Sequence, residues 1–256
     1  MEQWVGCNAL VTGASSGIGA ATAKKFIEAG INVIGIARRL DRLEELSQQI
    51  STDETKFYPL QCDVTNETEI LGVFEWIEAN VGPISILFNN AGTLVVNPLG
   101  ADGDLNIWKR TLYTNCLALS IFTREAIRVM KAHDIDGLII NNSSIAARYV
   151  PNHPLPNSSP NVYPATKFAV NALSNTLTNE LRHEKSKIRV SCVSPGLTLT
   201  EIFRYEPPEV LAAVGDSIPF LTSENIADSV MFILSTPPDV QVISLIVPSI
   251  YSVICS

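Results

Sequence analysis

The chain has 256 residues, 46% of them hydrophobic and only 17% charged, which excludes a disordered chain and allows one large α/β unit. Its net charge of −8, without any block of like charges, argues against nucleic acid or an anionic membrane surface as a partner. No apolar run is long enough to span a membrane, and the first residues carry no signal-peptide pattern, so we expect a cytoplasmic protein. The five scattered cysteines have no metal-ligand spacing, which predicts buried free thiols and no metal site.

The first strand and the turn after it indicate a phosphate-binding site. A short buried strand is predicted over Asn8–Val11, and an amphipathic helix over Ala20–Ala29. Between them, Thr12–Gly19 places its glycines in a G-x-x-x-G-x-G spacing. A glycine-rich turn between a strand and a helix directs backbone N–H groups and the helix N-terminus at a phosphate. We therefore predict dinucleotide binding here, with a purely structural turn as the alternative.

The end of the second strand favours NADP over NAD. Strand Ile31–Ala37 is followed by Arg38 and Arg39 and then by a helix, Asp41–Ile50. Folds that bind NAD commonly place an acidic side chain at this strand end, where it accepts a hydrogen bond from the ribose 2′-hydroxyl. Here Ala37 takes that place, and the two guanidinium groups beside it suit a 2′-phosphate. The alternative is a pair of solvated arginines at the start of the helix.

The third and fourth strands end in residues suited to the edge of a cofactor cleft. Strand Lys56–Cys62 runs into Asp63, whose carboxylate either accepts from the adenine amino group or caps the next helix, Asn66–Asn80. Strand Ile84–Phe88 runs into Asn89-Asn90-Ala91-Gly92. Small and amide residues at that place would let the backbone approach the cofactor and form hydrogen bonds with neighbouring loops.

The middle of the chain holds an unusual asparagine and a proline-rich loop. A long helical stretch, Leu105–Met130, contains Asn115, and asparagine is a poor residue for the middle of a helix. Its presence predicts either a functional role or a satisfied structural amide. After the fifth strand, Leu138–Asn142, come Ser143 and Ser144 and then a loop over 145–161 with four prolines, which excludes a helix or a central strand. Loops of this length tend to be functional, and His153 within it is expected to line a pocket.

The next helix carries a tyrosine and a lysine in a spacing that suits acid–base chemistry. On the predicted helix Asn161–Leu181, Tyr163 and Lys167 are four residues apart and share one face, and Pro164 fits the first turn. A free phenol titrates near ~10, and a nearby ammonium lowers that pKa towards neutral pH, where a general acid or base works best. The alternative is a chance pair on a solvated helix.

The last part of the chain completes a doubly wound sheet and supplies a second wall for a substrate. The predicted elements are strand Ile188–Val193 before Ser194-Pro195-Gly196, a small lid over 197–216, helix Ser223–Leu234 with Ser223 as its N-cap, and strand Val242–Val247. Strands alternating with helices predict a single α/β domain, a Rossmann-type fold with seven mostly parallel strands. The loop and the lid are expected to enclose an apolar cleft, with Ser144 and Tyr163 as its only convergent polar pair, lined by Tyr149, Val150, Pro151, Leu155, Leu197, Leu199, Ile202, Phe203 and Tyr205. The alternative is that the loop folds away and serves a subunit contact.

Taken together, the motifs resemble the short-chain dehydrogenase/reductase family over nearly the whole chain. They come in the family's order as Thr12–Gly19, Asp63, Asn89–Gly92, Asn115, Ser144, Tyr163-x-x-x-Lys167 and Pro195-Gly196. More narrowly, the stretches 35–39, 123–126, 163–167 and 234–238 are similar to arthropod NADP-dependent farnesol dehydrogenases and related vertebrate carbonyl and steroid reductases.

The resemblance implies a role for each residue of the site. Tyr163 would be the general acid/base, Lys167 would lower its pKa and hold the nicotinamide ribose, and Ser144 would stabilise charge on the reacting oxygen. Asn115 would hold a water that passes protons from Lys167 to solvent. The cofactor contacts expected are Gly13, Ser15, Ser16, Gly17, Ile18, Arg38, Arg39, Asp63, Val64, Asn90, Ala91, Gly92, Tyr163, Lys167, Pro195, Gly196, Leu197, Thr198 and Thr200.

The resemblance also implies the sheet order, the assembly and the reaction. Strands would follow the order 3-2-1-4-5-6-7, in homodimers or homotetramers packed through the helices that carry Asn115 and Tyr163. The expected reaction is NADP-dependent hydride transfer to or from an apolar alcohol or carbonyl, such as a farnesol-like isoprenoid alcohol. Steroid or xenobiotic carbonyls, and a catalytically silent nucleotide sensor, stay open as alternatives. Two features depart from the family: the long loop before Tyr163, and an apolar end over 246–256 that we expect to pack across a subunit interface, with contact with a membrane surface as the alternative.

Overall fold

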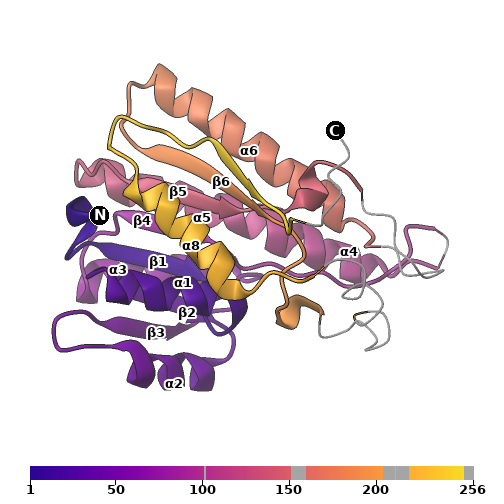
Figure 1. Ribbon diagram of the computed structural model, residues 1–256, viewed down its shortest axis with the longest axis horizontal. Coiled ribbons are helices and arrows are strands. Elements are labelled where there is room, and N and C mark those ends of the chain that lie inside the picture. The colour runs from indigo at the N-terminus through magenta and orange to yellow at the C-terminus, as the bar shows by residue number, and fades with distance from the viewer. Residues whose placement is uncertain (101, 151–159, 204–210, 212–218, 251–256) are drawn as a thin grey trace.

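A seven-stranded sheet lies at the centre of the computed structural model, which describes residues 1–100, 102–150, 160–203, 211 and 219–250 (Figure 1). Its strands are β1 (Asn8–Thr12), β2 (Asn32–Ala37), β3 (Phe57–Gln61), β4 (Ile86–Asn89), β5 (Leu138–Asn142), β6 (Arg189–Pro195) and β7 (Ser244–Val247). They lie in the order β3-β2-β1-β4-β5-β6-β7, and every neighbouring pair is parallel. Both the predicted Rossmann-type α/β fold and the predicted strand order are confirmed.

Helices cover both faces of the sheet. They are α1 (Gly17–Glu28), α2 (Leu40–Ile50), α3 (Glu67–Asn80), α4 (Leu105–Leu112), α5 (Leu119–Ala132), α6 (Tyr163–His183) and α8 (Ser223–Ser235). Apolar side chains of α1, α2 and α8 pack in one core with one face of the sheet, and those of α3, α5 and α6 pack in a second core with the other. In Figure 1, α1 and α8 lie side by side over the sheet.

The strand sequences account for the two cores. Along β1, Ala9 and Val11 contribute to the core under α1 and α8, and Leu10 contributes to the core under α3 and α5. Successive side chains of a strand point to opposite faces, so a strand covered on both sides needs an unbroken apolar run. The sequence has such apolar runs at β1, β2 and β4, which lie in the interior of the sheet.

The long helical stretch is not one regular α-helix. Between α4 and α5 the chain forms a π-helical turn, η2 (Tyr113–Ala118), which contains Asn115. π-helical turns inside α-helices are rare and frequently lie at functional sites. The asparagine that is unfavourable in a regular helix thus lies in the one stretch of this helix that is not α-helical.

Two further details differ from the sequence prediction. Helix α8 is capped by Thr222 and not by Ser223: the Thr222 hydroxyl accepts from Asn225 N at 3.3 Å, and the Asn225 side chain accepts from Thr222 N at 2.9 Å. The loop over 145–161 begins with a short 3₁₀ turn, Ile145–Ala147, before the part of the loop outside the described residues. The predicted apolar end starts inside β7, and residues 251–256 lie outside the described part of the chain.

Four cysteines lie within the described residues. Cys7, Cys62, Cys116 and Cys192 are free; Cys62 and Cys192 are buried, and the other two are half-buried. Burial raises the pKa of the Cys62 thiol to about 12, which makes it a poor nucleophile. Among the helices of the described residues, none combines the length and apolar character that crossing a bilayer requires.

Candidate active site

A cavity of about 880 Å³ opens along the carboxyl ends of the parallel strands. This is where ligands bind in open α/β sheets, and the volume lies at the upper end of the usual range for ligand pockets, ~300–1,000 Å³. All of the cofactor contacts expected from the sequence, and Ser144, line this one cavity. Asn115, by contrast, is buried behind it and is not a lining residue.

The glycine-rich turn presents an open helix end to the cavity. Gly13 and Gly17 have φ of +68° and +57°, which a residue with a side chain rarely adopts. Ser16 is the N-cap of α1, yet its side chain makes no capping hydrogen bond, and the first turn of the helix holds no acidic residue. The N–H groups there are therefore available for an anion, and the turn fits the pyrophosphate of a dinucleotide.

Hydrogen bonds tie the loop after β4 to the glycine-rich turn. The Thr12 hydroxyl accepts from the backbone N–H groups of Asn90 and Ala91, each at 2.9 Å. The Asn90 side chain donates to Thr12 O at 2.9 Å and accepts from the Asn142 side chain at 2.9 Å. The expectation that amide residues at this place join neighbouring loops is confirmed, and β1, β4 and β5 share one rigid cavity floor.

The adenosine end of the cavity carries the two arginines predicted from the sequence, and an unpredicted carboxylate. The terminal nitrogen of Arg39 donates to the hydroxyls of Ser15 and Ser16 at 3.2 and 3.1 Å. The same nitrogen lies 2.8 Å from a carboxylate oxygen of Glu201, in the short turn η4 (Glu201–Phe203). Arg38 lines the cavity and is exposed.

The structure decides one of the two alternatives for Asp63. Its carboxylate accepts from the backbone and the hydroxyl of Thr65, at 2.9 and 2.8 Å. Helix α3 is capped instead by Asn66, which accepts from Thr68 and Glu69. The capping alternative for Asp63 is therefore wrong, while its contact with the adenine stays a prediction.

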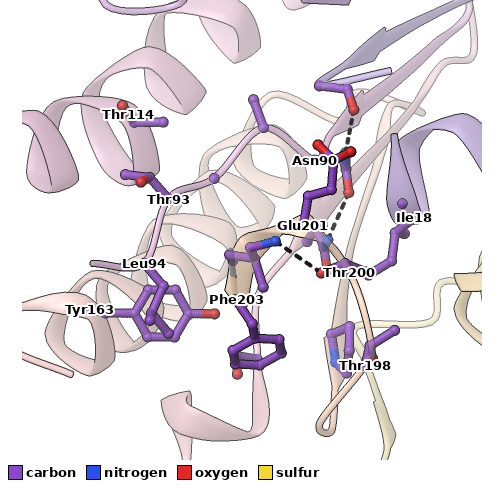
Figure 2. Close-up of a pocket in the computed structure, with 18 of the residues that line it drawn as sticks. Ile18, Asn90, Thr93, Leu94, Thr114, Tyr163, Thr198, Thr200, Glu201 and Phe203 are labelled. Atoms are coloured by element: carbon purple, nitrogen blue, oxygen red, sulfur yellow. Dashed lines mark hydrogen bonds between the residues drawn. The ribbon is translucent and has the colours of Figure 1, made fainter. Parts of the chain in front are cut away.

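The acid–base group gathers at the opposite end of the cavity. Tyr163 is the first residue of α6, and its hydroxyl is hydrogen-bonded to Ser144. Ser144 accepts from Ala146 N at 3.0 Å, and because its hydrogen bond with Tyr163 lowers the pKa of that phenol, its own proton is directed at the Tyr163 oxygen. Figure 2 shows the Tyr163 hydroxyl pointing into the cavity, towards the side on which Phe203 lies. Lys167 follows one turn later, with Nζ 5.6 Å from the centre of the Tyr163 ring.

Burial controls the pKa values of both catalytic candidates. It raises the pKa of Tyr163 to about 12, against a lowering by the hydrogen bond with Ser144. It lowers the pKa of Lys167 to about 8. The pKa of Tyr163 thus lies above its ordinary value and not below it, and Lys167 donates to Asn142 O at 2.8 Å. A lowering of the Tyr163 pKa by Lys167 stays a prediction. Each side chain is shifted towards its neutral form.

Asn115 links the loop after β4 to helix α6. Its oxygen accepts from Thr93 N at 2.9 Å, and its two amide hydrogens go to Thr93 O and the Thr166 hydroxyl, each at 3.0 Å. Of the two readings of this residue, the satisfied structural amide describes what its side chain does. The water-holding role stays a prediction, and both amide hydrogens are already used without it.

The substrate end was only partly foreseen. Tyr149, Leu197, Ile202 and Phe203 line the cavity as expected. Val150 and Leu199 do not: their side chains are 67% and 59% exposed, so these two predictions are wrong. Pro151, His153, Leu155 and Tyr205 lie outside the described residues.

Several lining residues were missed. The apolar ones include Leu94, Val96, Leu211 and Phe220, and the polar ones include Thr93, Arg110 and Thr114. Figure 2 shows Thr93 and Leu94, on the loop after β4, near Tyr163. Ser144 and Tyr163 are thus not the only polar residues at the cavity, contrary to expectation. The apolar run Leu94-Val95-Val96, shortly after Asn90-Ala91-Gly92, was the signal that could have identified Leu94 and Val96.

Comparison with known proteins agrees with this geometry. A family model described as short chain dehydrogenase matches residues 7–210. The chain is 38% identical to a farnesol dehydrogenase of Aedes aegypti over 94% of its length and 95% of that enzyme's. It is 40% identical to the Gallus gallus protein named dehydrogenase/reductase SDR family member 11, over 94% and 95% of the two chains.

Solved structures give the same result. A closed serine dehydrogenase in complex with NADP⁺ superposes with a TM-score of 0.82 at 29% identity, covering 93% of each chain. A metagenomic short-chain oxidoreductase in complex with NADP gives a TM-score of 0.77 at 27% identity, covering 96% of this chain and 98% of that one. With its fold, its cavity and these relatives in agreement, the chain belongs to the short-chain dehydrogenase family of oxidoreductases.

Proposed function

We propose that the chain is an NADP-dependent oxidoreductase that transfers a hydride between the nicotinamide and an apolar alcohol or carbonyl compound, such as a farnesol-sized isoprenoid alcohol. One observation carries the proposal: Ser144, Tyr163 and Lys167 meet at one end of a cavity whose further wall is largely apolar. Retention of all three polar groups argues against a silent nucleotide sensor.

The residues at the adenosine end fit NADP. The free N-terminus of α1 would hold the pyrophosphate, and Arg38 and Arg39 would bind the 2′-phosphate through charge-assisted hydrogen bonds. Asp63 would accept from the adenine amino group, and Leu197–Thr200 would contact the nicotinamide carboxamide. NADP in the two related structures supports this assignment.

The chain's own groups would manage the proton. When bound, the cofactor supplies or accepts the hydride. Tyr163, neutral at pH 7 with a pKa of about 12, would donate its proton to the carbonyl oxygen in reduction, while Ser144 donates a second hydrogen bond to the same oxygen. Lys167, with a pKa of about 8, would exchange a proton close to working pH and replenish Tyr163. Oxidation of an alcohol would need Tyr163 as a phenolate. The positive charge of a bound oxidised nicotinamide would stabilise that phenolate and so favour oxidation.

The substrate wall favours an apolar compound. Leu94, Val96, Ile202, Phe203 and Phe220 line the cavity, and the rings of Phe203 and Phe220 stack edge to face with centres 6.2 Å apart. Burial of each CH₂ contributes roughly 0.8 kcal/mol, so such a wall rewards long or flat hydrocarbon substrates over sugars and short hydroxy acids. The Aedes aegypti relative, named a farnesol dehydrogenase, supports the isoprenoid class.

A homodimer or homotetramer is part of the proposal. Exposed apolar side chains lie on the helical segment around Asn115 and on α6: Leu112 is 45% exposed, Leu117 48%, Phe168 45% and Leu173 38%. Self-association through these two helices would cover them. Light scattering coupled to size exclusion would give the assembly, and replacing Leu117 and Phe168 by aspartate should yield monomers.

A substrate panel tests the proposed function most directly. NADPH, NADH and their oxidised forms would be combined with isoprenoid alcohols and aldehydes, steroid ketones, aromatic ketones and polar polyols. We expect turnover with NADP(H) and the isoprenoid series. Preference for steroid ketones would keep the reaction class and change the substrate. Tight NADP binding without turnover of any compound would favour the silent sensor instead.

A further inference from the structure

A carboxylate occupies Arg39, one of the two arginines that the proposed function assigns to the cofactor's 2′-phosphate. Glu201 lies 2.8 Å from the terminal nitrogen of Arg39 through one oxygen and pairs with Arg42 through the other. Glu201 and Arg39 both line the cavity, as do Ser15 and Ser16, whose hydroxyls contact the same Arg39 nitrogen. One anion, two guanidinium groups and two hydroxyls therefore meet at the adenosine end.

This arrangement has the chemistry of a phosphate site filled by the protein itself. Guanidinium groups with hydroxyl donors beside them recognise phosphate and carboxylate in the same way. Arg39 holds the pKa of Glu201 below its usual range, and Arg42 adds to the effect, so the carboxylate is charged at neutral pH. A cofactor phosphate that approaches Arg39 meets this negative charge first.

Glu201 belongs to a segment that also contributes residues to the proposed substrate wall. It begins the turn η4, which also holds Ile202 and Phe203 of the cavity wall. The preceding residue, Thr200, lies against the glycine-rich turn, where a Cβ added to Gly17 would stand 3.2 Å from its methyl group. Figure 2 shows Thr200 and Glu201 on the side of the cavity where Ile18 lies.

We propose that Glu201 determines cofactor specificity as an internal competitor of the 2′-phosphate. The inference rests on the proposed use of NADP. The end of β2 has Ala37 where folds that bind NAD commonly have an acidic residue, and Glu201 brings a carboxylate to the same region from a distant part of the chain. This carboxylate reduces the advantage that Arg38 and Arg39 give to NADP over NAD. NAD, with a neutral 2′-hydroxyl, does not have to displace it.

The carboxylate can give way because its pairs are exposed. The side chains of Arg39, Arg42 and Glu201 are 35%, 44% and 39% exposed, and ion pairs of this kind are screened by water and salt. Each oxygen of the Glu201 carboxylate pairs with one arginine, however, so the carboxylate stays in place until a stronger anion competes. A phosphate with about −2 charge is such an anion.

Equilibrium binding of two small probes tests the proposal without turnover. Adenosine 2′,5′-bisphosphate carries the 2′-phosphate, and adenosine 5′-phosphate lacks it. Calorimetric titration of both, at one fixed salt concentration, would compare the unmodified protein with Glu201→Gln. The control is Glu45→Gln, which removes an equal charge on α2 that acts on Arg42 through space but pairs with Gln49 and not with Arg39.

We expect Glu201→Gln to bind the 2′,5′-bisphosphate roughly three- to tenfold more tightly, because an exposed ion pair and a like-charge repulsion are both removed. Adenosine 5′-phosphate should change less than about twofold, and so should both probes in Glu45→Gln. Weaker bisphosphate binding would overturn the proposal, since Glu201 would then orient Arg39 for the phosphate. An equal gain in Glu45→Gln would also overturn it, because a general field would explain the effect.

The same titration separates this inference from the proposed function. If the unmodified protein binds the two probes equally, the assignment of the 2′-phosphate site fails. If it prefers the bisphosphate but Glu201→Gln changes nothing, only the competitor proposal fails.

Discussion

The two ends of the cavity treat charge in opposite ways. At the end that holds the acid–base group, Tyr163 and Lys167 are 8% and 5% exposed, and burial is the main cause that raises the pKa of Tyr163 to about 12 and lowers that of Lys167 to about 8. At the adenosine end, Arg39 and Glu201 are more than a third exposed and form an ion pair. In the proposed function, proton transfer would take place where water is scarce, and recognition of a charged phosphate where ions can exchange with solvent. Changes at the acid–base end should therefore have large effects, and changes at the other end small ones.

The largest effect is expected from Tyr163→Phe. The ring would still pack, but the proton donor at the reacting oxygen would be gone, so kcat should fall by roughly 10²- to 10⁴-fold. Cofactor affinity, measured by fluorescence titration, should stay within about twofold. If the variant keeps most of its turnover, a different acid must act, and His153 would be the next residue to replace.

A pH series would sharpen the account of the buried end. Between pH 8 and 10 the unfolded chain holds a proton on Lys167 that the folded chain has largely released, so the folded state should gain stability as the pH rises. Below about 8 the cost of burying the ammonium is present in full. We expect the unfolding free energy to rise by about 2 kcal/mol more than in Lys167→Met over this range.

Urea titrations at pH 8, 9 and 10 give the comparison. The series stops at pH 10 because the pKa of Tyr163 in the folded chain is about 12, above its ordinary value. Above pH 10 the unfolded chain would lose this proton while the folded chain keeps it, and the resulting loss of stability would oppose the gain from Lys167. Identical pH slopes for the two proteins would mean that Lys167 is not desolvated as the structure indicates.

A smaller effect is expected from exchanging the charges after β2. Ala37→Asp combined with Arg38→Leu should move the ratio of kcat/KM values for NADP and NAD towards NAD by about tenfold or more, since a hydrogen bond to a charged group contributes about 1.5–3 kcal/mol. Arg39 is left in place, so its partner Glu201 is undisturbed. Equal efficiency with both cofactors in the unmodified protein would contradict the NADP assignment.

The smallest step is expected per methylene of substrate. Along a series of straight-chain and isoprenoid alcohols, each added CH₂ should raise kcat/KM by about fourfold until the cavity is full, from roughly 0.8 kcal/mol of transfer free energy. Phe203→Ala should flatten the series at its long end. A response independent of chain length, or better turnover of polyols than of farnesol-sized alcohols, would exclude an apolar cleft.

The sequence predicted most of what is local. Strand, glycine-rich turn and helix follow from Asn8–Glu28 alone, because apolar periodicity and glycine spacing are read within a few residues. The positions of Ser144, Tyr163 and Lys167 follow from the same local patterns together with the resemblance to a family. All of them line the cavity.

What depends on distant contacts could not be read. Glu201 forms an ion pair with Arg39, which lies 162 positions earlier in the sequence, and no periodic pattern in the sequence predicts that ion pair. Asn115, in the π-helical turn, forms hydrogen bonds with Thr93 and Thr166, which belong to other segments. Val150 and Leu199 were placed in the cleft because they are apolar, but which way a loop side chain points is set by the loop's own path. The pKa of Tyr163 was misjudged for a similar reason: the spacing gives its neighbours but not its burial.

The link made by Asn115 has a consequence for how such an enzyme could diversify. By fastening the backbone of Thr93 to Thr166 on α6, it fixes where the loop after β4 begins relative to Tyr163 and Lys167, whatever side chains come next. Leu94 and Val96, directly after that anchor, face the cavity. Mutations at these two positions can alter the accepted substrate while the reacting groups keep their places, so this loop is a natural target for laboratory evolution of new specificity.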